Sequence, residues 1–257
     1  MLKRILTAIV IIAVVIAPLY YGGILINILV GVICAFGAHE MLQLNANQKL
    51  WHNGYTFVFL ALLVASVLTP TNIGMMILLG LVLTIFAFPV FAKNFNSEDA
   101  MFFLGVCLLF FAFTKAFLII YNYNHLYVYF VLLATYGTDT GAYFVGYFFG
   151  KTKLIPNISP KKTVEGAVGG WFCGVLLGLL FGLFVIKDMN LTLLLLGCIW
   201  IPVVSQIGDL AFSAFKRHYH VKDFANIFPG HGGFMDRVDS LSFTIIFFLI
   251  LFFGTVL

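Results

Sequence analysis

The sequence predicts an all-α, polytopic integral membrane protein. Only 9% of its 257 residues are charged, 62% are hydrophobic, and the mean hydropathy is +1.08. Soluble domains carry roughly a quarter charged residues, so this composition cannot form a surface that faces water. The long apolar runs also lack the alternation of a β-barrel, which leaves helices as the structures that satisfy their backbone groups in lipid.

Nine membrane-spanning helices are expected, because the apolar runs are each about 20 residues long and are separated by polar or turn-forming segments. We predict them at 5–21, 23–41, 54–69, 73–92, 100–121, 125–149, 166–186, 191–214 and 238–257. The boundary at PLYYGG, between the first two, is the least marked. The first run follows Lys3 and Arg4, but no small-residue cleavage site follows it cleanly, so we interpret it as a retained helix.

Basic residues predict the orientation in the membrane. If the chain alternates sides, the face of the amino terminus holds all but two of the 14 Lys and Arg residues. They are Lys3, Arg4, Lys49, Lys93, Lys151, Lys153, Lys161, Lys162, Lys216, Arg217, Lys222 and Arg237. By the positive-inside rule this face is cytoplasmic, so we expect a multi-pass protein of the cell (inner) membrane with its carboxyl terminus outside. Of the exceptions, Lys187 lies in a short turn and Lys115 can snorkel to the interface.

Several familiar site patterns are missing from the sequence. The four cysteines fall inside predicted spans and form no C-x-x-C pair, which argues against disulfides and a thiolate metal site. His218 and His220 are two residues apart, so on a helix they point to different faces. The stretch GYFFGKT is not a phosphate-binding P-loop, because Val145 stands where its first glycine would be needed.

Asp139 is the most unusual residue inside a span. It lies about three helical turns from Lys151, where an uncompensated charge in lipid would cost several kcal/mol, so it must face a partner or a cavity. A neutral Asp139 that joins two helices and a functional Asp139 both remain open. Ala142, Gly146 and Gly150 repeat every four residues and predict close approach of another helix. Glu40 is weaker evidence, because its carboxylate can simply reach the interface.

The segment SQIGDLAFSAFKR predicts a site for ions and phosphate. Ser205, Asp209 and Ser213 recur at intervals of four, and Lys216 and Arg217 follow at the next turn. One helix face therefore carries oxygen ligands that give way to cations. A Lys-Arg pair at the end of a span is common, but an aspartate below it within the span is not.

The segment PGHGGFMDRVDS places glycines, a histidine and two aspartates at the start of the last span. Its backbone N–H groups can face an anion beside a helix amino terminus. Asp236 and Asp239 are three residues apart and can project to one side, where Mg²⁺ would accept one or two carboxylates and complete its shell with water and phosphate. A helix start capped by an aspartate is the simpler alternative, but it accounts for only one of them.

The run SAFKRHYHVKDFANIFPGHGGFMDRVD, residues 213 to 239, resembles the signature of phosphatidate cytidylyltransferases, also called CDP-diacylglycerol synthases. SPKKTVEG and SQIGD are also similar to that family, and the resemblance covers the chain from about 100 to the end. It implies transfer of a cytidylyl group from CTP to phosphatidic acid, with pyrophosphate as the second product. The first four spans match the family mainly in hydropathy. Together with the predicted spans and the charge distribution, the resemblance divides the chain into a group of four helices in residues 1–95 and a catalytic membrane domain in 96–257 with cytoplasmic loops at 151–165 and 215–237.

The resemblance and the residue patterns together give each candidate residue a role. We expect Mg²⁺ at Asp209 and Asp236, with Asp239 as a further ligand, and catalytic roles for Asp209, Asp236, Lys216 and Arg237. The expected contacts to substrate are Lys161, Lys162, Ser205, Ser213, Arg217, Lys222, His231, Gly232 and Gly233. The expected partners are CTP, phosphatidic acid and the lipid bilayer, without nucleic acid, and a homodimer remains open.

Two rival functions remain. A CTP-dependent lipid kinase would use the same nucleotide and metal but would transfer the γ-phosphoryl group. A transporter would also place a charge such as Asp139 inside the membrane and interrupt its helices with glycine. Against the transporter, the sequence shows no convincing inverted repeat, and its polar residues gather at the cytoplasmic face.

Overall fold

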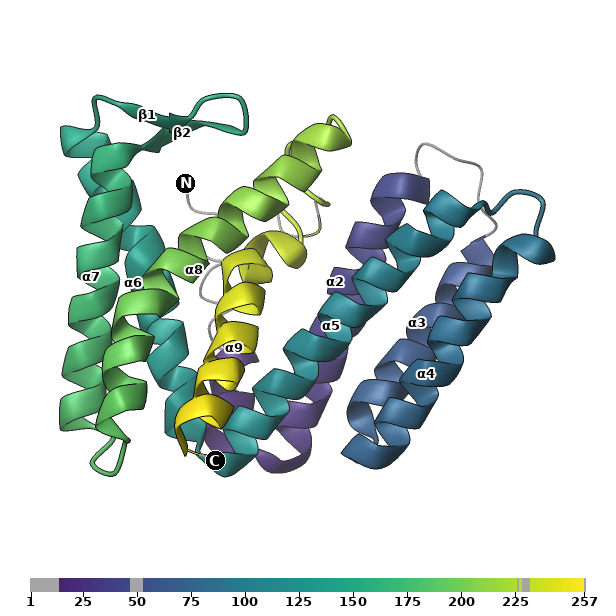
Figure 1. The fold of residues 1–257 in the computed structure, drawn as a ribbon, viewed down its shortest axis with the longest axis horizontal. Helices are drawn as coiled ribbons and strands as arrows, with labels where there is room; N and C mark the ends of the chain where they lie inside the picture. The colour runs from purple at the N-terminus through teal and green to yellow at the C-terminus, as the bar shows by residue number, and fades with distance from the viewer. Residues whose placement is uncertain (1–13, 47–52, 226, 228–231, 257) are drawn as a thin grey trace. The chain divides into compact units, whose positions relative to one another are not determined.

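The chain forms long helices and one short β-hairpin (Figure 1). The structure, a computed structural model, describes residues 14–46, 53–225, 227 and 232–256. Within these residues the fold is helical, as the composition predicts, with the hairpin as an addition that the hydropathy pattern did not indicate. Lys3, Arg4, Lys49 and His231, which the sequence analysis singled out, lie outside the described residues.

The helix boundaries follow the predicted spans closely. Residues 14–21 are helical and belong to the first predicted span. The remaining helices are α2 (Gly23–Ala46), α3 (Asn53–Leu68), α4 (Thr71–Ala87), the short 3₁₀ helix η1 (Phe88–Val90), α5 (Ser97–Tyr123), α6 (His125–Phe149), α7 (Val164–Phe184), α8 (Leu191–His218) and α9 (Met235–Val256). The strands β1 (Lys153–Ile155) and β2 (Ser159–Thr163) pair antiparallel between α6 and α7.

Six helical segments in the described part of the chain are long and apolar enough to cross a membrane. They are Gly23–Asn45, Thr71–Val90, Ser97–Tyr123, Val164–Phe184, Leu191–His218 and Met235–Val256. Helix α3 is apolar but shorter, and α6 is long but carries threonines, glycines and Asp139 in its second half. The protein is therefore a polytopic membrane protein.

Polar side chains mark where the helices of the second half begin. Asn124 accepts a hydrogen bond from the backbone N–H of Leu126 at the start of α6 (3.0 Å). Thr163 does the same for Gly166 at the start of α7 (3.1 Å). Asn190 caps α8, whose last turn carries Lys216, Arg217 and His218, a placement that favours cations at the negative end of the helix dipole.

The chain divides into two compact units, each described here by itself. The first comprises residues 1–118 and 221–236, and the second comprises residues 119–220 and 237–257. In the first unit α3 packs against both α2 and α4. Lys115 of α5 is buried there and donates a hydrogen bond to the carbonyl oxygen of Thr69 (2.7 Å), so its charge ends at the polar turn between α3 and α4.

In the second unit α6 and α7 pack more extensively than any other pair of elements. One face of α7 is a buried row of glycines: Gly166, Gly170, Gly174, Gly178 and Gly182. A Cβ at Gly170 would lie only 2.6 Å from the carbonyl oxygen of Thr138, so glycine is needed for this approach. Ala142 and Gly146 face the same row, which confirms the close helix contact predicted from their spacing. Helix α8 packs against both partners.

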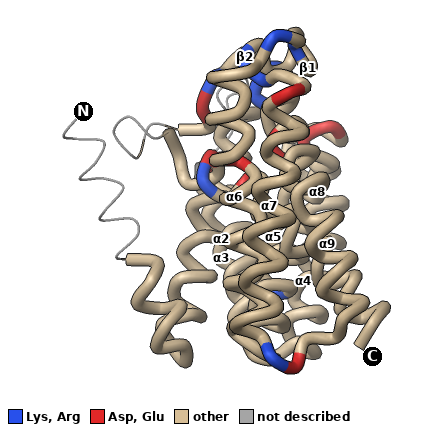
Figure 2. The backbone as a smooth tube through the Cα atoms, turned by 90° about the vertical axis from the view of Figure 1, so that its left-hand side faces the viewer, with Lys and Arg blue, Asp and Glu red and all other residues tan. Residues whose placement is uncertain are grey.

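Charged residues are unevenly distributed over the second unit. Many lie at the end that carries β1 and β2, and a smaller group, Lys187 and Asp188, lies at the turn between α7 and α8 (Figure 2). Lys151, Lys153 and Lys161 are exposed in and beside the hairpin. The polar end of this unit is therefore where a charged ligand from water would be received.

Candidate active site

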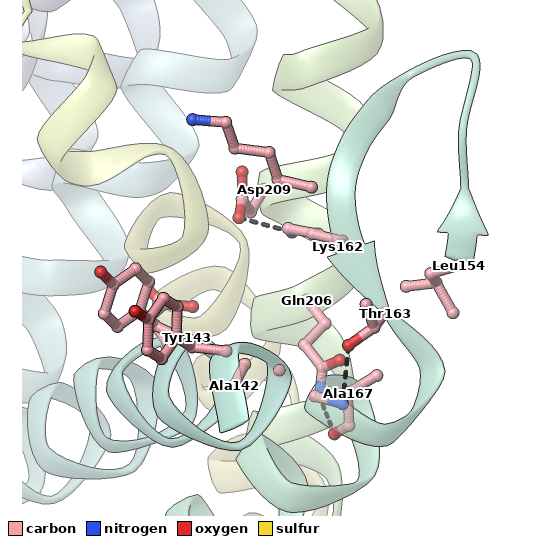
Figure 3. A pocket seen from close by; sticks show the side chains of 13 residues that line it. Ala142, Tyr143, Leu154, Lys162, Thr163, Ala167, Gln206 and Asp209 are labelled. Atoms are coloured by element: carbon pink, nitrogen blue, oxygen red, sulfur yellow. Dashed lines mark hydrogen bonds and ion pairs between the residues drawn. The ribbon is translucent and has the colours of Figure 1, made fainter. Parts of the chain in front are cut away.

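A cavity of about 610 Å³ lies in the second unit, between α6, the hairpin, α7 and α8 (Figure 3). Its polar lining comes from Asp139, Lys161, Lys162, Gln206 and Asp209. The other walls include small residues of α6 and α7 and the side chains of Tyr143 and Tyr147. The cavity thus combines ammonium groups, carboxylates and an apolar wall, which suits a ligand that is both anionic and partly apolar.

The hairpin positions the two cavity lysines. Strand β2 carries Lys161 and Lys162 and pairs with β1 through Lys153 opposite Thr163 and Ile155 opposite Ser159. Both ends of the hairpin are fixed by side chains from helices of the same unit. The carboxylate of Glu165 accepts hydrogen bonds from the backbone N–H groups of Lys151 and Thr152 (3.1 Å each), and the Nε of Arg217 donates to the carbonyl of Ile158 (3.2 Å).

Lys162 and Asp209 form an ion pair across the cavity wall (2.5 Å), as Figure 3 shows. Their side chains are 27% and 29% exposed, so water and ligands can reach both groups. Ser213, one turn further along α8, donates to the other carboxylate oxygen of Asp209 (3.4 Å). An ion pair this open to solvent contributes little stability, so Lys162 can exchange its carboxylate partner for a phosphate at low cost.

Asp139 also lines the cavity and is held by two hydroxyl groups. Ser205 of α8 donates to its Oδ1 (3.4 Å) and Ser240 of α9 donates to its Oδ2 (3.1 Å). Ser205 itself is fully buried, so its placement supports Asp139 and does not line the cavity. Three helices therefore meet at Asp139, which the sequence analysis placed at a membrane depth where an unpaired charge has a high free-energy cost.

Other charged residues of the second unit do not line the cavity, and one of them, Asp239, interacts with two carboxylates that do. Asp239 interacts electrostatically with the carboxylates of Asp209 and Asp139 and with the ammonium of Lys216. Lys216 is buried, whereas Arg217 and Arg237 are exposed. The carbonyl oxygen of Arg237 accepts a hydrogen bond from the hydroxyl of Tyr136 (3.0 Å). Carboxylates that repel one another favour a cation between them.

Asp209 and Asp239 are carboxylates of this region that could hold a metal ion. Among the described residues no group of three or more His, Cys, Asp or Glu side chains is arranged to hold a metal ion. Mg²⁺ is usually bound by one or two carboxylates and completes its octahedral shell with water and substrate phosphate. Asp209 already pairs with a cation, the ammonium of Lys162. The carboxylate of Asp239 interacts electrostatically with the carboxylate of Asp209.

The glycine segment before α9 belongs to the first unit, together with Lys222 and Asp236. The Oδ2 atom of Asp236 accepts hydrogen bonds from the backbone N–H groups of Gly233 (2.9 Å) and Phe224 (3.1 Å). Gly232 has a φ of +81°, a conformation that favours glycine. Lys222 is exposed. The segment is thus a built loop whose aspartate is held by backbone groups.

Sequence reasoning gave little weight to one residue that contacts this loop from α2. Glu40 of α2 is buried and accepts hydrogen bonds from the backbone N–H groups of Phe234 and Met235 (2.8 Å each). Its position near the end of an apolar span suggested a side chain at the interface. The only signal in the sequence is a carboxylate that follows a long apolar run, and that signal names no partner.

A family comparison covers almost the whole chain. The model of the cytidylyltransferase family matches residues 2–254. The chain belongs to the cytidylyltransferase family. Phosphatidate cytidylyltransferases of Staphylococcus epidermidis and Staphylococcus haemolyticus are 35% and 33% identical to it over 256 residues, covering 94% of this chain and 95% of each relative. The same enzyme of Staphylococcus aureus is 33% identical over the same shares.

The family match extends further than the signature indicated. The resemblance read from the sequence began at about residue 100, whereas the match begins at residue 2 and includes the first helices. The amino-terminal helices of this cytidylyltransferase are therefore part of the family fold and not an unrelated anchor. The match also includes Glu40 and the SPKKTVEG segment that forms β2 and the start of α7.

Proposed function

We propose that this family member is a phosphatidate cytidylyltransferase, which transfers the cytidylyl group of CTP to phosphatidic acid and releases pyrophosphate. The near full-length similarity to relatives that bear this name carries the proposal. The cavity of the second unit supports it, since Lys161 and Lys162 supply cations for phosphate and Asp209 supplies a carboxylate for a metal. The product, CDP-diacylglycerol, would keep its acyl chains in the bilayer.

The chemistry requires two polyanions to meet. An oxygen of the phosphatidate phosphate attacks the α-phosphorus of CTP, a new phosphoanhydride bond forms, and the bond from the α-phosphorus to the pyrophosphate oxygen breaks. No covalent enzyme intermediate is needed, so catalysis rests on positioning and charge neutralisation. We assign Lys161, Lys162, Lys216 and Arg217 to the phosphate groups, together with Arg237 and Lys222 from the signature.

Asp209 and Asp239 would hold the magnesium ion, and the signature adds Asp236. When bound, Mg²⁺ would neutralise phosphate oxygens and assist the leaving pyrophosphate. Lys162 then has a defined task in this chain. It neutralises Asp209 in this structure, and it could turn to a substrate phosphate if Asp209 were to hold the metal ion. Ser213 keeps the Asp209 carboxylate oriented through its hydrogen bond.

The membrane arrangement that we propose keeps nine spans. Helices α3 and α6 and the first predicted span would cross the bilayer in addition to the six long apolar helices. The hairpin would face the cytoplasm, where CTP is available, and phosphatidate would reach the catalytic domain of residues 96–257 from the bilayer. Whether the protein forms a homodimer is left to a mass measurement in detergent.

The experiment that tests this function asks which phosphorus of CTP enters lipid. Purified protein is mixed with phosphatidate, Mg²⁺ and CTP labelled at the α or the γ position. We expect α label in an organic-extractable product, an equal amount of pyrophosphate, and no lipid label from the γ position. Lipid labelled from the γ position would instead establish the lipid kinase, and CTP left unconsumed would favour the transporter.

A further inference from the structure

Glu40 is a buried carboxylate that the proposed chemistry does not use. It lies in α2 with 2% of its surface exposed, and both of its oxygens are occupied. Oε1 accepts the backbone N–H of Phe234 and Oε2 accepts that of Met235, each at 2.8 Å. One turn earlier on α2, the ring of Phe36 stacks on the ring of Phe234 with centroids 5.1 Å apart.

These contacts give hydrogen-bond donors to the carboxylate of Glu40 and an acceptor to the backbone N–H groups at the start of α9. The first N–H groups of a helix have no partner inside the helix, and they attract negative charge. Hydrogen bonds from them to a carboxylate are charge-assisted and are stronger than those between neutral groups. Glu40 therefore takes the capping role that a residue next to the helix usually takes, although it comes from a distant part of the sequence.

Two carboxylates accept hydrogen bonds from three consecutive backbone N–H groups, those of Gly233, Phe234 and Met235. We call the glycine segment that leads into α9, to which these groups belong, the signature loop. Asp236 accepts the N–H of Gly233, and Glu40 accepts those of Phe234 and Met235. A Cβ at Gly233 would lie 2.6 Å from Oε1 of Glu40, so the glycine is needed for the carboxylate to reach the backbone. Asp236 also accepts a hydrogen bond from the backbone N–H of Phe224. A shift of Gly233 would therefore change one of the two backbone contacts that orient the Asp236 carboxylate.

We propose that Glu40 is a positioning residue for catalysis, which fixes the backbone of Gly233–Met235 and thereby the orientation of the Asp236 carboxylate. The inference rests on the proposed function, because that function assigns the signature loop to the active site. The hydrogen-bond donors to Glu40 among the described residues are the backbone N–H groups of Phe234 and Met235, so in this proposal it acts through the loop and not on substrate. Its loss should lower kcat much more than it changes KM for CTP or phosphatidate.

The test compares Glu40→Gln with Glu98→Gln, which removes an exposed acid from the first turn of α5 in the same unit. Glutamine keeps the length of the side chain but offers one acceptor oxygen, so its amide group must face the second N–H donor. Per folded molecule, we expect kcat of Glu40→Gln to fall at least tenfold, with KM values within threefold of the wild type. Glu40→Asp, which keeps the charge, should retain more activity than Glu40→Gln.

A second readout does not depend on activity. Hydrogen exchange of the peptide that contains Phe234 and Met235 should become at least tenfold faster in Glu40→Gln and stay unchanged in Glu98→Gln. Unchanged exchange in Glu40→Gln would overturn the positioning role, and faster exchange with normal kcat would overturn its part in catalysis. A wild type that transfers no cytidylyl group refutes the proposed function, and the exchange result then still decides whether Glu40 holds the loop.

Gly233→Ala covers the case in which Glu40→Gln does not fold. Its methyl group would collide with the Glu40 carboxylate, so it should reproduce the loss of kcat and the faster exchange while Glu40 itself is intact. In a Glu40→Ala background the collision is gone, and Gly233→Ala should then add less than threefold to the loss. Full additivity of the two substitutions would contradict a direct contact between these residues.

Discussion

At the scale of single residues, the site of the second unit depends on Asp209 and its two neighbours. Lys162 approaches one oxygen of its carboxylate and Ser213 donates to the other. The pair is partly exposed and therefore contributes little to stability. We propose that Lys162 exchanges this carboxylate for a substrate phosphate, which would leave Asp209 able to hold a metal ion.

Substitution of Asp209 separates these two roles. Asp209→Asn keeps the shape of the side chain but removes its charge, so we expect turnover to fall on the order of 100-fold or more. The loss of a partly exposed ion pair should change stability by about 1 kcal/mol or less, so the melting temperature in detergent should barely move. Cytidylyl transfer is measured over a range of Mg²⁺ concentrations, with thermal unfolding alongside.

The matched control is Asp188→Asn, which removes an exposed aspartate from the turn between α7 and α8 of the same unit. It should leave turnover and its dependence on Mg²⁺ unchanged. Near-normal turnover of Asp209→Asn with ordinary Mg²⁺ dependence would remove Asp209 from the catalytic assignment.

Residue spacing indicated part of this site in advance, because some of its members lie on one helix. Ser205, Asp209 and Ser213 recur every four residues along α8, and that period places them on one face before any tertiary structure is known. Glu40 and Ser240 could not be found in this way. Their partners lie 194 and 101 residues away in sequence, so only the folded chain brings them together.

At the scale of elements, hydropathy located the helices, since lipid demands long apolar runs and tolerates few alternatives. The predicted span 125–149 coincides with α6, whereas α8 continues one turn beyond the predicted residue 214 to His218. That last turn carries Lys216, Arg217 and His218, and no glycine or proline within it ends the helix earlier. The hairpin escaped prediction because its strands carry no alternation of apolar and polar residues, and helix side chains hold its ends.

The hairpin can be tested through Glu165, which accepts the backbone N–H groups of Lys151 and Thr152 but does not line the cavity. Glu165→Gln should loosen the base of the hairpin and misplace Lys161 and Lys162. Because these lysines are assigned to substrate phosphate, we expect KM for CTP or phosphatidate to rise about three- to tenfold at nearly constant kcat. Steady-state kinetics in mixed micelles measures this, with Glu98→Gln as the control for the loss of an acid. A fall in kcat at unchanged KM would show that the hairpin serves the chemical step and not binding.

At the scale of the whole molecule, the distribution of charge connects the fold to the source of each substrate. Basic residues concentrate in the segments that we assign to the cytoplasmic face, where CTP is dissolved, and the apolar helices are long enough to lie in the bilayer, where a lipid substrate is found. The cavity with lysines at the polar end of the second unit is where we propose that the two substrates meet.

The orientation can be tested with two cysteines placed at opposite ends of α7. Asn157 is exposed between β1 and β2, and Asp188 is exposed in the turn that follows α7. The 21 residues of α7 extend about 30 Å, the thickness of the hydrocarbon core, so the two positions must lie on opposite sides if α7 spans the membrane. We expect Asn157→Cys to be protected from a membrane-impermeant thiol reagent in intact cells and to react after permeabilisation, whereas Asp188→Cys reacts in both.

The native cysteines give a low background, because three are buried and Cys173 is half-buried. Reversed labelling would overturn the cytoplasmic assignment of the hairpin, and labelling of both positions in intact cells would show that α7 does not cross.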